Sequence, residues 1–233
     1  MDDEPPSEDT PLRIVLADDH PLVRDALRRT LDTQPDMDVV GEASDGQEAV
    51  ELCISLRPDL VLMDVRMPNL DGLEATRQIK KEVPGTIVLI LTASDWPYDL
   101  SEALKAGAAG YMLKVAPIPE TIDAVRKVAA GESPLNQELA AQLLRRLVED
   151  VPKGRRIPEG DPLLESLTPR EAEMLRLMTR GYTNQQLARN LHISVSTVKK
   201  HVRSVISKLG VSDRTQAAVR AVELGLLAEH QRE

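Results

Sequence analysis

Five polar residues stand where apolar runs of the sequence end. Asp18 and Asp19 follow one run, Asp64 closes the run LVLMD, and Thr92 and Lys114 end two later runs. Short apolar runs are typical of buried parallel strands, whose carboxyl ends meet at one crevice. The sequence therefore predicts that three carboxylates, a hydroxyl and an amine converge on one site.

This set of side chains suits a divalent cation. Mg²⁺ is a hard ion that prefers oxygen ligands and keeps several waters. We expect the carboxylates of Asp18, Asp19 and Asp64 to hold it, with the backbone carbonyl of Arg66 as a further oxygen ligand regardless of that residue's side chain. The predicted cofactor is therefore Mg²⁺.

Phosphoryl transfer is the chemistry that this site predicts. Asp64 is the expected nucleophile and would form an aspartyl phosphate. The cation and the Lys114 ammonium would offset charge on the phosphoryl oxygens, and the Thr92 hydroxyl would hydrogen-bond the group in place. Each residue taken singly has a simpler role, such as Asp19 capping a helix. Their coincidence at strand ends, in the right order, favours a site.

The elements that must position these residues alternate along the chain. Predicted strands cover residues 12–17, 39–43, 60–64, 86–92 and 110–113, and predicted helices cover 21–33, 46–56, 72–82, 97–106 and 120–130. Five such repeats predict a doubly wound, five-stranded parallel sheet, a flavodoxin-like α/β fold. Only helices are predicted beyond residue 131, so an all-α domain should follow.

Charge also divides the chain of 233 residues. Residues 1–130 hold 13 Lys and Arg against 25 Asp and Glu, whereas residues 167–227 hold 10 against 4. The basic end is a candidate for nucleic-acid binding. We expect a disordered acidic tail at 1–11, a phosphoacceptor domain at 12–131, a linker with one helix at 132–164 and a helix-turn-helix domain at 165–229.

Three features of the sequence predict where the protein is located. No apolar run is long enough to span a membrane, and the acidic first residues lack the apolar stretch of a signal peptide. The single cysteine, Cys53, cannot form an intramolecular disulfide and lies among apolar residues at helical spacing. We therefore expect a cytoplasmic protein without a membrane partner.

Sequence blocks in the N-terminal half resemble the receiver domain of two-component response regulators. The blocks ADDHPLVR, LVLMDVRMPNLDG, LTAS and GAAGYMLK follow that family's order and spacing. The resemblance implies that Asp64 is the phosphoacceptor, that Thr92 is the switch hydroxyl, and that Tyr111 is the aromatic switch residue. Asp18, Asp19 and Lys114 match the acidic pair and the lysine of the family. One departure is Val115, where many receivers have a cis proline.

A basic amphipathic helix is predicted near the C-terminus. Apolar residues at spacings of three and four, from Val195 through Val198, Val202 and Val205 to Leu209, form one face, and basic and hydroxyl side chains lie largely opposite. A short connection separates it from a preceding helix at 184–191. This pattern predicts a helix-turn-helix, whose second helix enters the major groove.

The segment from LTPREAEML to DRTQAA closely resembles the LuxR-type DNA-binding domain, which is an all-α four-helix domain, with STVKKHV and KLG as its most specific blocks. The resemblance implies that Lys199, Lys200 and Arg203 contact DNA, with Thr197 and His201 nearby. It also implies that the last helix pairs two DNA-bound copies. Thr168 with Glu171 and Thr183 with Gln186 have the spacing of capping boxes and predict two helix starts. Gln186 stands where many members have Glu, but serves a capping box equally well.

Together, the two resemblances identify a member of the NarL/FixJ family of response regulators. They imply that a sensor histidine kinase phosphorylates Asp64 with Mg²⁺, which releases or dimerises the C-terminal domain to bind double-stranded promoter DNA. We expect self-phosphorylation and slow self-dephosphorylation but no substrate turnover.

Three other functions stay open. A phosphate-independent regulator with a vestigial receiver is the main alternative. A haloacid-dehalogenase-type phosphatase would need an acid two residues after its nucleophile, where this chain has Arg66. A quorum-sensing regulator would need an aromatic-lined ligand pocket, and residues 12–130 hold only three aromatic residues, on a receiver pattern.

Overall fold

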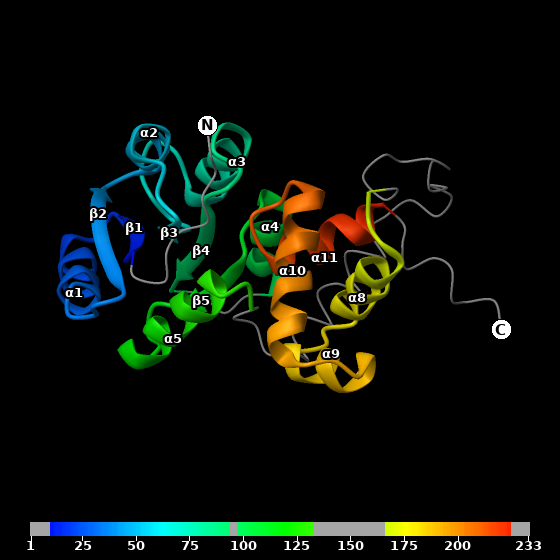
Figure 1. Ribbon diagram of the computed structural model, residues 1–233. Helices are drawn as coiled ribbons and strands as arrows, with labels where there is room; N and C mark the ends of the chain where they lie inside the picture. The colour runs from blue at the N-terminus through cyan, green and yellow to red at the C-terminus, as the bar shows by residue number, and fades with distance from the viewer. Residues whose placement is uncertain (1–9, 94–96, 133–165, 225–233) are drawn as a thin grey trace. The chain divides into compact units, whose positions relative to one another are not determined.

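The computed structural model describes residues 10–93, 97–132 and 166–224 (Figure 1). Nearly all of the predicted acidic tail and of the predicted linker, including its helix, lie outside the described residues. Among the residues that are described, no helix has the length and apolar character needed to cross a lipid bilayer.

Five strands form one parallel sheet in the order β2-β1-β3-β4-β5. The strands are β1 (Leu12–Ala17), β2 (Met37–Ala43), β3 (Leu60–Asp64), β4 (Ile87–Thr92) and β5 (Gly110–Leu113). Every residue of β3 is buried, as expected for a central strand covered on both faces. The order places the switch point of the topology between β1 and β3, where such sheets bind ligands. The predicted fold class is confirmed.

Helices connect the strands and cover the sheet. They are α1 (Pro21–Leu31), α2 (Gly46–Leu56), α3 (Gly72–Glu82), α4 (Pro97–Ala106) and α5 (Ile118–Ala129). Helices α2 and α3 pack side by side on one side of the sheet, and α1 and α5 lie on the other (Figure 1). Asp45 and Asp71 cap α2 and α3 by accepting hydrogen bonds from backbone N–H groups of the first turn.

Two elements begin earlier than the sequence predicts. Strand β2 begins at Met37, because Met37 and Val39 are buried while Asp38 between them is exposed. A search for continuous apolar runs misses Met37, because the polar residue Asp38 separates it from Val39. Helix α5 begins at Ile118, which places Pro119 in the first turn, where the missing N–H has no intrahelical partner to lose.

The turn between β3 and α3 brings two backbone segments into close approach. The N–H of Gly72 donates to the carbonyl of Val65 at 2.8 Å. A Cβ at Gly72 would lie 1.9 Å from the carbonyl oxygen of Asp64 and 2.9 Å from its carbonyl carbon. Glycine at this position therefore lets α3 start directly against the end of β3.

Residues 166–224 form the helices α8 (Pro169–Thr179), α9 (Asn184–Leu191), α10 (Val195–Leu209) and α11 (Arg214–Glu223). Both predicted capping boxes are present, Thr168 with Glu171 and Thr183 with Gln186. The apolar face of α9 and most of the predicted apolar face of α10 are buried in one core, which includes Leu187, Ala188, Leu191, Val198, Val202, Val205 and Leu209.

Glu171 ties the start of α8 to the second half of α10. Its carboxylate accepts hydrogen bonds from the Ser204 hydroxyl at 2.7 Å and the Lys208 ammonium at 2.6 Å. It also accepts from the Thr168 backbone N–H at 2.8 Å. Burial raises the pKa of Glu171, but these hydrogen bonds lower it more, to about 2. Glu171 therefore stays ionised and holds α10 against α8.

We predict that Gly72→Ala destabilises the sheet by about 2 kcal/mol or more, because the added methyl group meets backbone atoms that cannot turn away. Gly85→Ala is the matched control, since a Cβ there has no atom within 4 Å. Urea unfolding followed by circular dichroism measures both. Equal unfolding midpoints for the two variants would contradict the close approach at Gly72.

We predict that Glu171→Gln lowers the local opening free energy of α8 and α10 by about 2 kcal/mol at pH 7, because it removes charge-assisted hydrogen bonds. The folded pKa is depressed, so the contribution is complete above the ordinary pKa of 4.5 and is lost as the pH falls toward 2. Hydrogen exchange of peptides from both helices measures the effect.

Glu173→Gln is the control for this prediction, because Glu173 is half exposed and pairs with Arg170 on the surface. It should change exchange very little. If both variants accelerate exchange equally, or if the effect of Glu171→Gln persists undiminished at pH 3, the assigned role of Glu171 is wrong.

Candidate functional site

Strand register brings Asp18 beside Asp64. Ala17 of β1 pairs with Met63 of β3, so the next residues, Asp18 and Asp64, follow the same rung of the sheet. Both aspartates are buried, with 2% and 4% of their surface exposed. Two residues that lie far apart in sequence thus present carboxylates at the same edge, as the strand-end pattern predicted.

Backbone contacts bring Thr92 and Lys114 to this edge. Asp64 pairs with Leu91 of β4, so Thr92 follows on the adjacent strand. The N–H of Lys114 donates to the carbonyl of Thr92 at 2.7 Å. Thr92 is buried, with 4% of its surface exposed. The sheet therefore places both residues at the carboxyl ends of the strands, alongside the carboxylates.

The ammonium group of Lys114 lies between two of the carboxylates. Its Nζ is 2.7 Å from Asp64 Oδ2, to which it donates a hydrogen bond, and 2.6 Å from Asp18 Oδ2. The side chain of Lys114 is only 14% exposed. Such short contacts out of water make this ammonium the principal balance for the buried negative charge.

The pKa values of Asp64 and Lys114 are both shifted in this contact. Burial raises the pKa of Asp64 and repulsion from Asp18 adds to it, while the hydrogen bond from Lys114 opposes the shift without cancelling it. Burial lowers the pKa of Lys114, but the two carboxylates raise it more, so its pKa lies above the usual value. The ammonium thus stays charged beside a carboxylate whose own charge is incompletely compensated.

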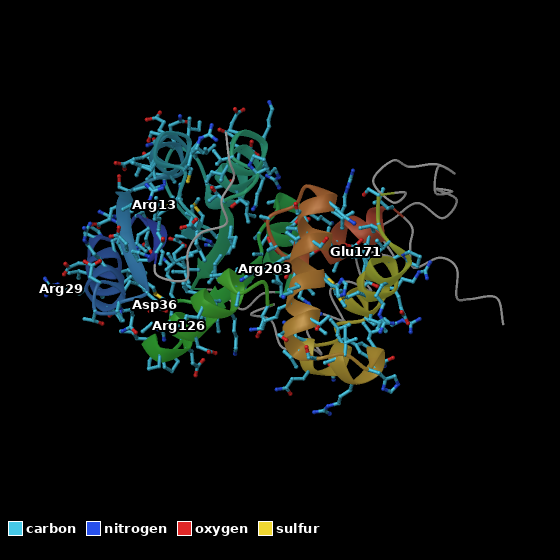
Figure 2. The ribbon with its side chains drawn as sticks, in the orientation of Figure 1. Arg13, Arg29, Asp36, Arg126, Glu171 and Arg203 are labelled. Atoms are coloured by element: carbon cyan, nitrogen blue, oxygen red, sulfur yellow. The ribbon has the colours of Figure 1, made fainter. Side chains whose placement is uncertain are left out.

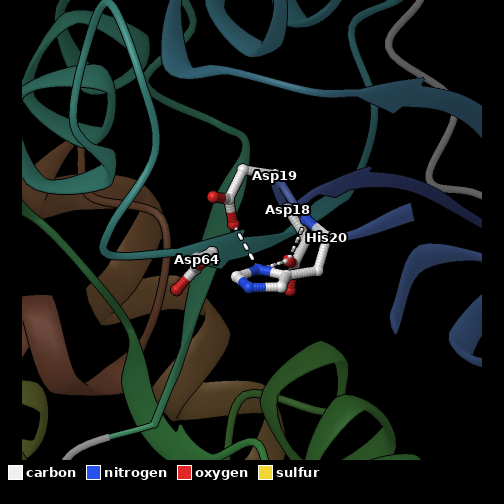
Figure 3. A group of neighbouring side chains, drawn as sticks. All are labelled: Asp18, Asp19, His20 and Asp64. Atoms are coloured by element: carbon white, nitrogen blue, oxygen red, sulfur yellow. Dashed lines mark hydrogen bonds and ion pairs between the residues drawn. The ribbon is translucent and has the colours of Figure 1, made fainter. Parts of the chain in front are cut away.

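Asp19 and His20 complete the acidic edge (Figure 3). His20 Nδ1 lies 2.5 Å from Asp19 Oδ1 and 3.4 Å from Asp18 Oδ1. The predicted site omitted His20, although a histidine directly after two aspartates could have signalled it. Helix α1 begins after His20, so Asp19 does not act as its N-cap.

The donor atoms fit one divalent cation. One atom from each of Asp18, Asp19, His20 and Asp64 can be chosen so that all lie within 4.8 Å of one another. Within the described residues, Asp18 Oδ2 and Asp19 Oδ1 are buried and accept no well-formed hydrogen bond, although cationic or imidazole nitrogens lie at ion-pair distance. Oxygen atoms with spare acceptor capacity are the ligands that Mg²⁺ needs.

Other predicted residues of the site are placed by the fold but not tested in their roles. The backbone N–H of Arg66 donates to Asp64 Oδ1 at 3.3 Å, and the ligand role of its carbonyl stays a prediction. Tyr111 lies in β5, partly buried, and its switch role also stays a prediction. Val115 is 81% exposed, and the described residues contain no cis peptide bond.

Helix α10 carries the predicted DNA contacts. Lys200 and Arg203 are exposed, and Thr197, Lys199 and His201 are partly exposed; Figure 2 shows Arg203 on this helix. The predicted apolar stripe is wrong at its first member, because Val195 is 38% exposed. As the first residue of α10, Val195 has no preceding helical turn to cover it.

Comparisons with known proteins agree with this geometry. The family model described as the response regulator receiver domain matches residues 14–126. The model described as bacterial regulatory proteins of the luxR family matches residues 165–221.

Relatives match most of the chain. The transcriptional regulatory protein LiaR of Bacillus subtilis is 42% identical over 210 residues, which cover 90% of this chain and 96% of LiaR. The response regulator VraR of Staphylococcus aureus is 40% identical over 216 residues, covering 93% and 99%. Among solved structures, the RcsB response regulator of Salmonella typhimurium superposes with a TM-score of 0.52. The match has 26% sequence identity and covers 87% of this chain and 93% of the RcsB chain. The chain therefore belongs to the NarL/FixJ family of two-component response regulators, in which a receiver domain precedes a LuxR-type helix-turn-helix domain.

Proposed function

We propose that a sensor histidine kinase phosphorylates this protein on Asp64, and that the phosphoryl group controls binding of the C-terminal domain to promoter DNA. The observation that carries the proposal is the contact of Lys114 Nζ with Asp64 and Asp18 at the ends of their strands. Family membership supports both halves of the proposal.

Asp64 is the group that would react. A bond forms between one of its carboxylate oxygens and phosphorus, while the bond from phosphorus to the imidazole nitrogen of the donor breaks. The bond electrons leave with that nitrogen, and the product is an acyl phosphate. Burial next to Lys114 positions the carboxylate and limits the access of water.

The neighbouring residues have separate roles in the proposal. The carboxylates of Asp18, Asp19 and Asp64, with the carbonyl of Arg66, would hold Mg²⁺, which supplies positive charge next to the phosphoryl oxygens. Lys114 adds a second positive charge on its own side. The Thr92 hydroxyl would then donate to a phosphoryl oxygen. Tyr111 would repack behind it as the conformational switch.

The C-terminal domain is the proposed output. Lys199, Lys200 and Arg203 would contact phosphates or base edges, with Thr197 and His201 nearby. RcsB, which resembles this chain over both domains, is a response regulator whose structure is described in terms of DNA interaction. A homodimer paired through α11 would bind half-sites about one helical turn apart, roughly 10 bp.

The domain boundaries are part of the proposal. The phosphoacceptor domain spans 12–131 and the DNA-binding domain 165–229, joined by a linker at 132–164. The matched family ranges, 14–126 and 165–221, support this division. No substrate is turned over, and the reactions of the receiver are its own phosphorylation and slow dephosphorylation.

A phosphate-independent regulator with a vestigial receiver is the alternative function. It requires no reactive carboxylate at position 64. The raised pKa of Asp64 and its contact with Lys114 disfavour this alternative. Burying the carboxylates of Asp18 and Asp64 together costs stability, and such strained groups are typical of functional sites. Chemical labelling separates the two functions.

We predict that acetyl phosphate adds one phosphoryl group to the whole protein when Mg²⁺ is present, and none when a chelator removes the cation. Asp64→Asn should abolish the adduct, because the amide is not a nucleophile. Asp25→Asn, which makes the same change in an exposed ion pair with Arg29, should leave it intact. Intact-mass spectrometry gives the result, and an adduct that survives in Asp64→Asn would sink the proposal.

We also predict that Arg203→Gln weakens binding to a mixed-sequence DNA duplex. The plot of log association constant against log salt concentration should become less steep by about one unit, because one phosphate contact is lost. Arg176→Gln removes the same charge from the exposed face of α8 and should leave the slope unchanged. Fluorescence anisotropy at several salt concentrations measures the slope. Identical slopes for the two variants would refute the assignment of α10.

A further inference from the structure

The imidazole of His20 lies at the acidic edge, where it neither caps a helix nor packs in the core. It occupies the N-cap position of α1, yet its side chain caps no backbone N–H. By contrast, α2 and α3 have aspartate N-caps that do accept such hydrogen bonds. The side chain of His20 is 66% exposed, so the core does not require it. The choice of histidine at this position therefore needs another explanation.

The backbone of His20 holds it at the site. Its N–H donates to Asp18 Oδ1 at 2.9 Å, which fixes the residue directly above the buried carboxylate. From there the imidazole lies next to Asp19 and Asp18, and Figure 3 shows it between the two, with a dashed line to each. The ring turns on two exposed bonds, so its nitrogen can move without disturbing the sheet.

The distances suit coordination by four protein groups. Zn²⁺ binds carboxylate oxygen at about 2.0–2.2 Å and imidazole nitrogen at about 2.0–2.1 Å, usually with four ligands. In a tetrahedral site, two ligand atoms on one such ion lie about 3.4 Å apart. The four candidate atoms are all within 4.8 Å of one another, so side-chain rotations must draw the more distant pairs together for all four to bind one ion.

We propose that His20 joins Asp18, Asp19 and Asp64 as a nitrogen ligand in a Zn²⁺ site that competes with Mg²⁺. The inference rests on the proposed function, since it takes the same carboxylates as the metal site. Imidazole favours Zn²⁺, whereas carboxylates and water favour Mg²⁺. A Zn²⁺ ion held by four protein ligands leaves no position for a phosphoryl oxygen. Zn²⁺ bound in this way keeps the receiver unphosphorylated.

A weaker role for His20 makes a different prediction. If the imidazole only orients Asp19 by a hydrogen bond, its loss weakens every cation by the same factor. If it binds the ion, its loss weakens Zn²⁺ much more than Mg²⁺. The ratio of the two affinities therefore distinguishes a ligand from a positioning residue.

The experiment measures Zn²⁺ and Mg²⁺ affinity of the whole protein at fixed pH, with a chelating indicator for Zn²⁺ and titration calorimetry for Mg²⁺. The variant is His20→Gln, whose amide still reaches Asp19 as a hydrogen-bond donor. We expect Zn²⁺ affinity to fall at least tenfold, because losing even an outer partner of a ligand costs about 10–100-fold. Mg²⁺ affinity should change less than about threefold. Equal losses for the two ions, or no loss for Zn²⁺, would overturn the proposal.

Two further variants make the outcome specific. His192→Asn removes an exposed histidine at the end of α9, where asparagine accepts the left-handed backbone, and it should change neither affinity. Asp64→Asn should weaken both ions. If it weakens neither, the carboxylates are not the metal site and the proposed function fails with the inference. If Asp64→Asn weakens both ions but His20→Gln changes neither affinity, the inference fails and the proposed function stands.

Labelling provides a second readout. Zn²⁺ should block phosphorylation of the wild-type protein by acetyl phosphate in the presence of Mg²⁺. In His20→Gln, labelling should persist at Zn²⁺ concentrations at least tenfold higher. Equal sensitivity of both proteins to Zn²⁺ would count against a ligand role for His20.

Discussion

Incomplete compensation of buried negative charge is the constraint on which the site depends. The parallel register of β1 and β3 forces Asp18 and Asp64 to one edge, and burial removes the water that would screen them. Within the described ranges, Lys114 is the one ammonium that contacts both. Asp19 adds a third carboxylate, so negative charge exceeds positive charge at the edge. A site with this excess of negative charge favours an added cation, which is the basis of the proposed Mg²⁺ site.

A buried carboxylate in the C-terminal part shows the opposite outcome. Glu171 is as well buried as Asp64, yet Lys208, Ser204 and the Thr168 backbone satisfy it, and its pKa falls to about 2. The pKa of Asp64 is instead raised. The same type of group therefore has a lowered pKa where its hydrogen bonds are complete and a raised pKa where burial and a neighbouring carboxylate outweigh them. This contrast separates a helix clamp from a site of chemistry.

Much of the fold and part of the site could be predicted, because both follow local patterns. Apolar runs indicated all five strands, and capping boxes marked the starts of α8 and α9. Prediction was weaker where tertiary burial overrides the pattern. Met37 belongs to β2 although Asp38 interrupts its run, and Val195 is exposed although it begins an apolar stripe. His20 directly follows the two aspartates, but only the folded structure places its imidazole next to both of them.

The sequence by itself determined the order of strands and helices, the polar residues at the strand ends, and the family. These are local properties, set by side-chain periodicity and by turn and capping residues within a few positions. Only the tertiary structure decided which charges meet. Lys114 and Asp64 are 50 positions apart, and their 2.7 Å contact exists because the sheet order places β3, β4 and β5 in succession. Burial, which sets the pKa of each group, likewise depends on the packing of the whole sheet and not on neighbouring residues.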